Sequence, residues 1–342
     1  MNARDNTEVD DGWLCDKGRY GFQIFHAAER VVEPLLREGG GLRPVSWERA
    51  LEEAVRGLDR AGERTAAVVG GETTNEEGFL VQFLMREVLG SPHIDSRTGG
   101  DLDGEHARSL ARPDLSAAVS DLDYAGAVLV LGTELVDEAP ILDLRVRKAA
   151  RRSGVPLVLA TSRPSSLDPS ATAVLRYAAG AEEAAIAALV AELAGAEAPA
   201  PSRSGRASLH DAAEQLGMRR PDRDAEWAKR AGVSPESVRA AADALRGAGP
   251  VVVLWGDRLS HGRRGPQAVG ALLALSRVLD LGPAGGAGMI EIPSAANLRG
   301  LREVGCLPNL KAGLADADTP GLDSAAIASA LGEDLHALLL ST

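Results

Sequence analysis

The sequence predicts an α/β fold in which helices cover sheets of mainly parallel strands. The first observation is a set of short, mostly apolar runs at 66–69, 127–131, 155–160, 251–255, 289–292 and 337–340. Such runs are typical of strands that are covered on both faces. The second observation is that helical stretches separate them, at 75–88, 139–152, 181–194, 234–246 and 265–281. Strand–helix–strand spacing indicates parallel strands joined by crossovers, which are right-handed in nearly all proteins.

The ends of these helices carry recognisable signals. Thr74 and Asn75 can cap a helix that continues to Val88, and Gly90 can stop it. The helix at 139–152 ends in basic residues, which suit the negative pole of its dipole. These signals support the helix assignments independently of the apolar runs.

Two segments bear on the organisation of the chain. The stretch 197–205 is rich in proline and serine and is predicted to be a linker. The last apolar run, at 337–340, is expected to form a strand inside a parallel sheet, with further chain needed to complete its cover. On that expectation the strand exposes apolar surface when it stands at the end of the chain.

Composition excludes several classes of function. The 342 residues carry a net charge of −12, and no basic stripe appears, which argues against nucleic acid binding. The acidic, polar start is no signal peptide, and no apolar run approaches the roughly 20 residues that span a bilayer. Cys15 and Cys306 are the only two cysteines, so no disulfide framework is expected. The chain is predicted to be soluble and cytoplasmic.

Glycine-rich and histidine-containing segments have simple structural interpretations. The run 282–288 precedes an apolar stretch, whereas a dinucleotide fingerprint follows a strand and opens a helix. The segment 256–262 follows a predicted strand but lacks the Gly-Lys-Ser/Thr of a phosphate-binding loop. No NADH site is therefore expected. The six histidines are dispersed without the spacing of zinc ligands.

Five segments together carry a family resemblance. They are Trp13–Tyr20 around Cys15, Val45–Leu51, Thr74–Glu77, Leu129–Arg147 and Ile290–Gly305. They resemble segments of the molybdopterin oxidoreductase family. The third is similar to a Thr-Asn-Glu-Glu helix start of that family, and the last two resemble its branch in respiratory complex I, the G subunits of bacterial NADH-quinone oxidoreductase.

The resemblance implies two αβα layered domains with mainly parallel sheets, one inserted in the other. Residues 1–60 are expected to be a remnant of the iron–sulfur segment with its lead-in. The first domain is then built from 61–122 and, incompletely, from 250–342, and the inserted domain from 123–249. On this interpretation the chain is truncated at both ends.

The resemblance also implies a cofactor. In the intact subunit Cys15 would be one of four ligands of a [4Fe-4S] cluster, with Lys17 nearby as a positive charge favouring the reduced cluster. The chain alone is not expected to retain the cluster, because three thiolates are missing. Catalytic relatives carry a Cys, selenocysteine or Ser metal ligand in the stretch matching 95–115, which here offers only Ser96 and Ser109. No molybdopterin is therefore expected.

The resemblance implies that the chain is a scaffold within the hydrophilic arm of respiratory complex I, which passes electrons from NADH to quinone. The expected partners are other hydrophilic-arm subunits, on the cytoplasmic side of the bacterial membrane, without direct insertion into it. The fragment itself is expected to be inactive. Two alternatives stay open: a molybdopterin-dependent oxidoreductase of the formate dehydrogenase type, which bound molybdenum or tungsten would reveal, and a stand-alone α/β interaction module.

Overall fold

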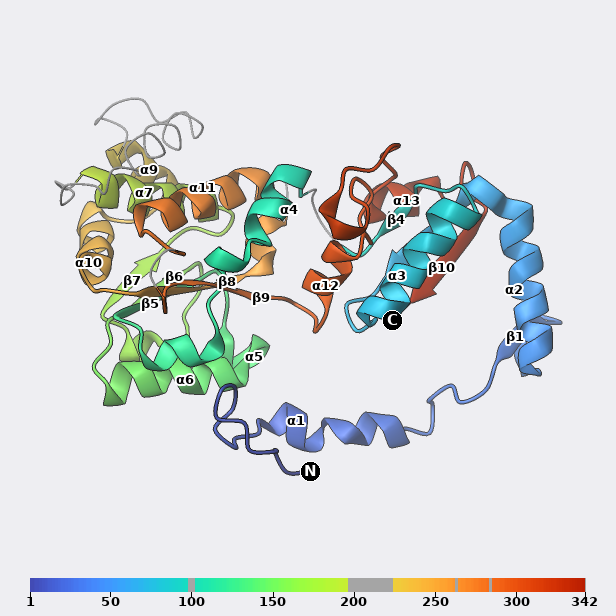
Figure 1. Cartoon of the computed structure of the whole chain (residues 1–342), viewed down its shortest axis with the longest axis horizontal. Coiled ribbons are helices and arrows are strands. Elements are labelled where there is room, and N and C mark those ends of the chain that lie inside the picture. Colours follow the sequence, from blue (N-terminus) through green and yellow to red (C-terminus); the bar gives the residue numbers. More distant parts are fainter. Residues whose placement is uncertain (98–101, 196–223, 262–263, 283–284, 342) are drawn as a thin grey trace. The chain divides into compact units, whose positions relative to one another are not determined.

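The computed structural model describes residues 1–97, 102–195, 224–261, 264–282 and 285–341 (Figure 1). The predicted linker at 197–205 lies outside them. The chain divides into two compact units. Unit 1 comprises Met1–Arg4, Leu14–Gly99 and Ala295–Thr342, and unit 2 comprises Asp5–Trp13 and Gly100–Ser294. Among the described residues no helix is both long and apolar enough to cross a bilayer.

Unit 2 is built on a five-stranded parallel sheet of order β7-β6-β5-β8-β9. Its strands are β5 (Ala127–Leu131), β6 (Leu157–Thr161), β7 (Ala173–Arg176), β8 (Val251–Gly256) and β9 (Gly288–Ile292). Every residue of β5, β6 and β8 is buried, as expected of parallel strands covered on both faces. The strands predicted around these positions are confirmed, except that β7 was not predicted.

Helices cover both faces of this sheet. Those of unit 2 are α4 (Gly104–Leu110), α5 (Leu135–Glu138), α6 (Pro140–Arg152), α7 (Glu182–Gly195), α9 (Asp224–Ala231), α10 (Pro235–Leu245) and α11 (Gly265–Val278). Figure 1 shows α7 and α11 over one face, and α5 and α6 over the other. Val146 of α6 packs in one core cluster with Val128, Leu157 and Leu254 of three adjacent strands. Short 3₁₀ turns lie at Pro113–Leu115, Val119–Asp123, Asp168–Ser170 and Asp257–Ser260.

Unit 1 contains a smaller parallel sheet of order β10-β3-β4 and one antiparallel hairpin. The sheet strands are β3 (Thr65–Val69), β4 (Ile94–Asp95) and β10 (Ala337–Ser341). The hairpin joins β1 (Leu35–Glu38) to β2 (Gly41–Pro44). Gly39 and Gly40 both have positive φ, as a two-residue hairpin loop requires.

The helices of unit 1 are α1 (Asp16–Tyr20), α2 (Trp47–Ala61), α3 (Asn75–Phe83), α12 (Leu298–Glu303) and α13 (Ser324–Ala330). A π-helical turn, Leu84–Val88, continues α3, and 3₁₀ turns lie at Gly21–His26, Gly62–Arg64 and Ala312–Leu314. Thr74 and Glu77 form a capping box at the start of α3. The predicted cap and the predicted extent of this helix are therefore confirmed.

The last strand was predicted inside a parallel sheet with incomplete cover that exposes apolar surface. The structure confirms the strand, its parallel pairing with β3 and its exposed leucines, but β10 lies at an edge of the three-stranded sheet rather than inside it. Leu339 packs against the core of unit 1, whereas Leu338 and Leu340 are exposed. The apolar run arises because this edge strand presents leucine to both of its faces.

The compact units also differ from the predicted domain boundaries near 122 and 250. β8 pairs with β5 and with β9, so the stretch 250–294 shares the sheet of 123–249 and belongs to unit 2. The segment 102–122 also lies in unit 2. Unit 2 thus extends further along the chain in both directions than the predicted insert.

Candidate functional site

Cys15 and Lys17, the two residues predicted to serve a cluster, lie at the start of the short helix α1. Cys15 is the N-cap residue, and its Sγ accepts a hydrogen bond from the backbone N–H of Gly18 at 3.4 Å. The thiol is half-buried and Lys17 is exposed. Locally, Cys15 acts as a helix cap, which is a role that a small polar side chain commonly fills.

The donor set around Cys15 does not fit an iron–sulfur cluster. A [4Fe-4S] cluster needs four thiolates. Within the described part of the chain, no three His, Cys, Asp or Glu side chains are grouped as metal ligands. Cys15 could therefore contribute one ligand and no more. Of the two serines considered as metal ligands, Ser96 is buried in unit 1 and Ser109 is half-buried in α4 of unit 2.

Cys306, the other cysteine, is fully buried in unit 1 among apolar side chains. Its thiol donates a hydrogen bond to the carbonyl of Gly78 at 3.2 Å. Burial raises its pKa to about 12, and the nearby Arg86 only partly opposes this. The thiol is therefore protonated at neutral pH and inert as a nucleophile or ligand.

The raised pKa of Cys306 predicts a loss of stability at high pH. A thiol whose folded pKa of about 12 exceeds its usual 9.0 contributes stability that is fully present below pH 9 and is lost as the pH rises towards 12. Across this window the free energy of unfolding of the wild type should fall more steeply than that of Cys306→Ala, as measured by urea titration at each pH. Cys15→Ala, at the half-exposed cysteine, should follow the wild type; parallel curves for all three proteins would contradict the prediction.

A crevice in unit 2 lies where the carboxyl ends of three strands meet. A cavity of about 220 Å³ is lined by Gly132 and Thr133 after β5, Thr161 and Arg163 at the end of β6, and Arg258 after β8. β5 pairs on one side with β6, the next strand along the chain, and on the other side with β8, which comes much later in the sequence. Such a reversal of strand order is where open parallel sheets bind ligands. The sequence interpretation missed this crevice.

Two carboxylates of the crevice accept hydrogen bonds from nearby hydroxyl groups. Glu138 accepts from the hydroxyl of Thr133 at 2.7 Å and lies 3.8 Å from Arg258. Glu134 accepts from the hydroxyl of Ser166 at 2.6 Å. Burial raises the pKa of Tyr177, which also lines the crevice, with Glu182 as a second cause.

The charge of the crevice is unsuited to a phosphate-bearing cofactor such as a pterin. Its charged lining consists of three carboxylates, Glu134, Glu138 and Glu182, against two guanidinium groups, Arg163 and Arg258. Anion sites in proteins use the opposite balance, with backbone N–H groups or cations facing the phosphate. The residues of this crevice therefore do not fit the group.

A comparison with known protein families identifies the family of the chain. The sequence pattern of the molybdopterin oxidoreductase family matches residues 30–317. The chain belongs to this family. The resemblance predicted from the sequence segments is therefore confirmed, and the α/β class with mainly parallel sheets is confirmed by the strand pairing.

Individual proteins resemble the chain over more than half of its length. The G subunit of NADH-quinone oxidoreductase from Streptomyces coelicolor is 30% identical over 338 residues, 93% of this chain and 34% of that protein. The corresponding G subunit from Mycobacterium bovis is 36% identical over 193 residues, 54% of this chain and 24% of that protein. The NADPH-Fe(3+) oxidoreductase subunit alpha of Geobacter sulfurreducens is 31% identical over 89% of this chain and 36% of that protein. The chain thus spans about a quarter to a third of these relatives.

Among solved structures, acetylene hydratase from Pelobacter acetylenicus superimposes with a TM-score of 0.61 at 16% identity. The match covers 82% of this chain and 40% of that one. This likeness shows the shared fold.

Proposed function

We propose that the chain is a scaffold part of a G subunit of NADH-quinone oxidoreductase, in the hydrophilic arm that passes electrons from NADH to quinone. The observation that carries the proposal is the 30% identity to the G subunit of Streptomyces coelicolor across 93% of the chain. The G subunit of Mycobacterium bovis, at 36% identity, supports the same branch of the family.

In this role the chain positions other components and performs no chemistry itself. Cys15 would supply one thiolate to a [4Fe-4S] cluster whose remaining ligands come from outside the described residues, with Lys17 as a nearby positive charge. The partners are other hydrophilic-arm subunits, and the location is peripheral, on the cytoplasmic face of the membrane. The acidic strand-end crevice supports a silent scaffold, because its carboxylates oppose the anionic cofactor of catalytic family members.

The experiment is to purify the tagged chain, expressed in its own cells, from gently solubilised membranes. Subunits of NADH-quinone oxidoreductase should co-purify, NADH-dependent quinone reduction should be present in the eluate, and molybdenum and tungsten should be absent by elemental analysis. Stoichiometric molybdenum or tungsten with formate oxidation would replace the proposal by the formate dehydrogenase alternative. A monomeric, folded chain that recovers no such subunit would favour the stand-alone interaction module.

A further inference from the structure

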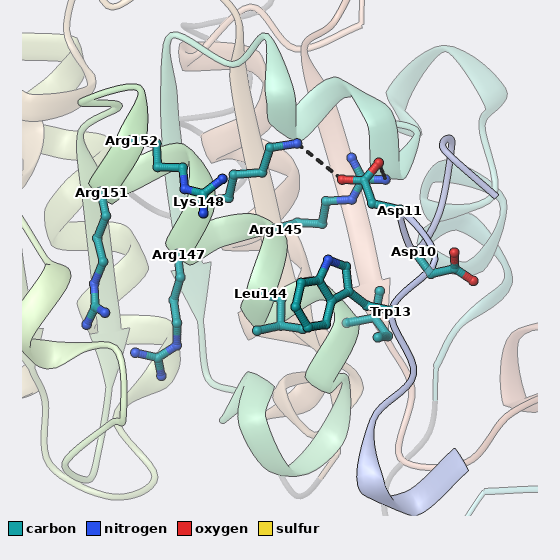
Figure 2. A pocket seen from close by; sticks show the side chains of 10 residues that line it. Asp10, Asp11, Trp13, Leu144, Arg145, Arg147, Lys148, Arg151 and Arg152 are labelled. Atoms are coloured by element: carbon teal, nitrogen blue, oxygen red, sulfur yellow. Dashed lines mark hydrogen bonds and ion pairs between the residues drawn. The ribbon is translucent and has the colours of Figure 1, made fainter. Parts of the chain in front are cut away.

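A pocket in unit 2 lies between helix α6 and the chain segment that precedes α1. Its volume is about 370 Å³, and it is lined by Asp10, Asp11 and Trp13 on one side and by residues 141–152 of α6 on the other (Figure 2). The strand-end crevice shares no lining residue with it.

Buried Arg145 holds in place the N-terminal segment, residues 5–13, which forms one side of the pocket. Its guanidinium donates to the carbonyls of Thr7 at 2.7 Å and Val9 at 3.2 Å. It also pairs with Asp123 at 2.6 Å and with Asp11 at 3.3 Å. The segment is thereby held against α6, and the pocket is preformed.

The unmatched charge of the pocket is positive. Asp11 is occupied by Arg145 and Lys148, and the carboxylate of Asp10 accepts backbone N–H groups of its own loop. Arg147 is paired with Asp143. By contrast, Arg151 donates to the neutral hydroxyl of Ser170. The guanidinium of Arg152 makes no hydrogen bond or ion pair with any described residue. In a chain of net charge −12, this is a local surface that attracts anions.

The floor of the pocket is apolar. Trp13 is 64% exposed and Leu144 is 43% exposed. Figure 2 shows the Trp13 ring beside Leu144, with Arg147 and Arg151 extending in the same direction from α6. An exposed tryptophan next to arginines is the kind of anchor that is enriched at the centre of protein interfaces.

We propose that this pocket docks an acidic peptide segment of a partner protein. Carboxylates of the segment would pair with Arg151 and Arg152, and one apolar side chain would rest on Trp13 and Leu144. This inference goes beyond the proposed function and does not depend on it, because it stands on the chemistry of the pocket alone.

The composition of the pocket favours a peptide over a small anion. Arg151 and Arg152 lie in the last turn of α6, where backbone carbonyls rather than N–H groups are free, which disfavours a phosphate bound by the backbone. The apolar surface of Trp13 and Leu144 in the same pocket suits a peptide that carries both carboxylates and an apolar side chain.

The test is fluorescence anisotropy of a labelled peptide that alternates glutamate with glycine around one central phenylalanine, titrated with the full chain. We expect saturable binding that weakens as salt is added. Arg152→Glu should weaken it about fivefold, and Trp13→Ala about tenfold. Matched controls are Arg239→Glu, an exposed arginine on α10, and Trp47→Ala, an exposed tryptophan on α2; both should bind as the wild type does.

Three results would overturn the proposal. The first is no binding of the acidic peptide, or equal binding of a peptide with lysine in place of glutamate. The second is an equal loss of affinity in the control variants, which would make the effect one of general charge. The third is saturable binding of ATP with the same sensitivity to Arg152→Glu while the peptide fails to bind, which would assign the pocket to a small anion.

Discussion

Replacing Arg145 by alanine should lower the free energy of unfolding by about 3 kcal/mol and release the N-terminal segment from α6. The side chain is 3% exposed and is hydrogen-bonded to two backbone carbonyls and to Asp123. Its removal leaves Asp123 and Asp11 with Lys148 as their remaining cation among the described residues, and it takes this donor from the carbonyls of Thr7 and Val9. Because both carboxylates are partly exposed, water recovers some of the loss, which places the estimate at the lower end of the range for buried pairs.

Urea unfolding measures the stability change, and limited proteolysis measures the release, since a freed segment at 5–13 should be cut before the rest of unit 2. Arg151→Ala is the matched control, because it makes the same substitution on the same helix at an exposed residue whose side chain, among the described residues, bonds only Ser170. It should change the free energy by roughly 0.5 kcal/mol or less. A loss in Arg145→Ala no larger than in this control would show that the buried pairing does not hold the segment.

The buried strands could be read from the sequence because their environment dictates their composition. β5 and β8 are covered on both faces, so apolar residues fill every position and the run stands out against the polar chain around it. β7 was missed for the opposite reason. It is a short edge strand with alternating burial, and a pattern of four residues is too short to separate from a loop.

The extent of the two compact units could not be read from the sequence, because it depends on pairing between distant segments. The apolar run at 251–255 identifies a strand, but nothing in it says that its neighbours are β5 and β9. The same limit applies to the buried Arg145, whose partners Thr7 and Val9 are more than a hundred residues away in sequence.

The candidate sites were predicted only in part. The sequence singled out Cys15 by its surroundings, and the structure places it as the half-buried cap of a short helix. The strand-end crevice was missed because its lining comes from loops after three separate strands. A signal was nevertheless present, since Gly132, Thr133 and Glu134 directly follow a buried strand of a predicted parallel sheet, where ligand-binding loops commonly lie.

Gly126→Ala should destabilise unit 2 by about 3 kcal/mol, because the new methyl group has no space. A Cβ at this position would lie 1.6 Å from the carbonyl oxygen of Ala248 and 3.2 Å from Cα of Gly249. These are backbone atoms of the turn that leads into β8, so no side chain can swing away. The N–H of Gly126 also donates to the carbonyl of Pro250 at 2.7 Å, which fixes the starts of β5 and β8 against each other. The substitution must therefore move one of the two central strands.

Gly57→Ala in α2 is the matched control for Gly126→Ala, because a Cβ there meets nothing within 4 Å. In the interior of a helix, alanine is favoured over glycine by up to about 1 kcal/mol, so the control should gain stability while Gly126→Ala loses it. Urea unfolding followed by circular dichroism gives both values from the same assay. If Gly126→Ala unfolds at the wild-type urea concentration, the close approach of the Ala248 carbonyl to Gly126 is wrong, and with it the tight junction between β5 and β8.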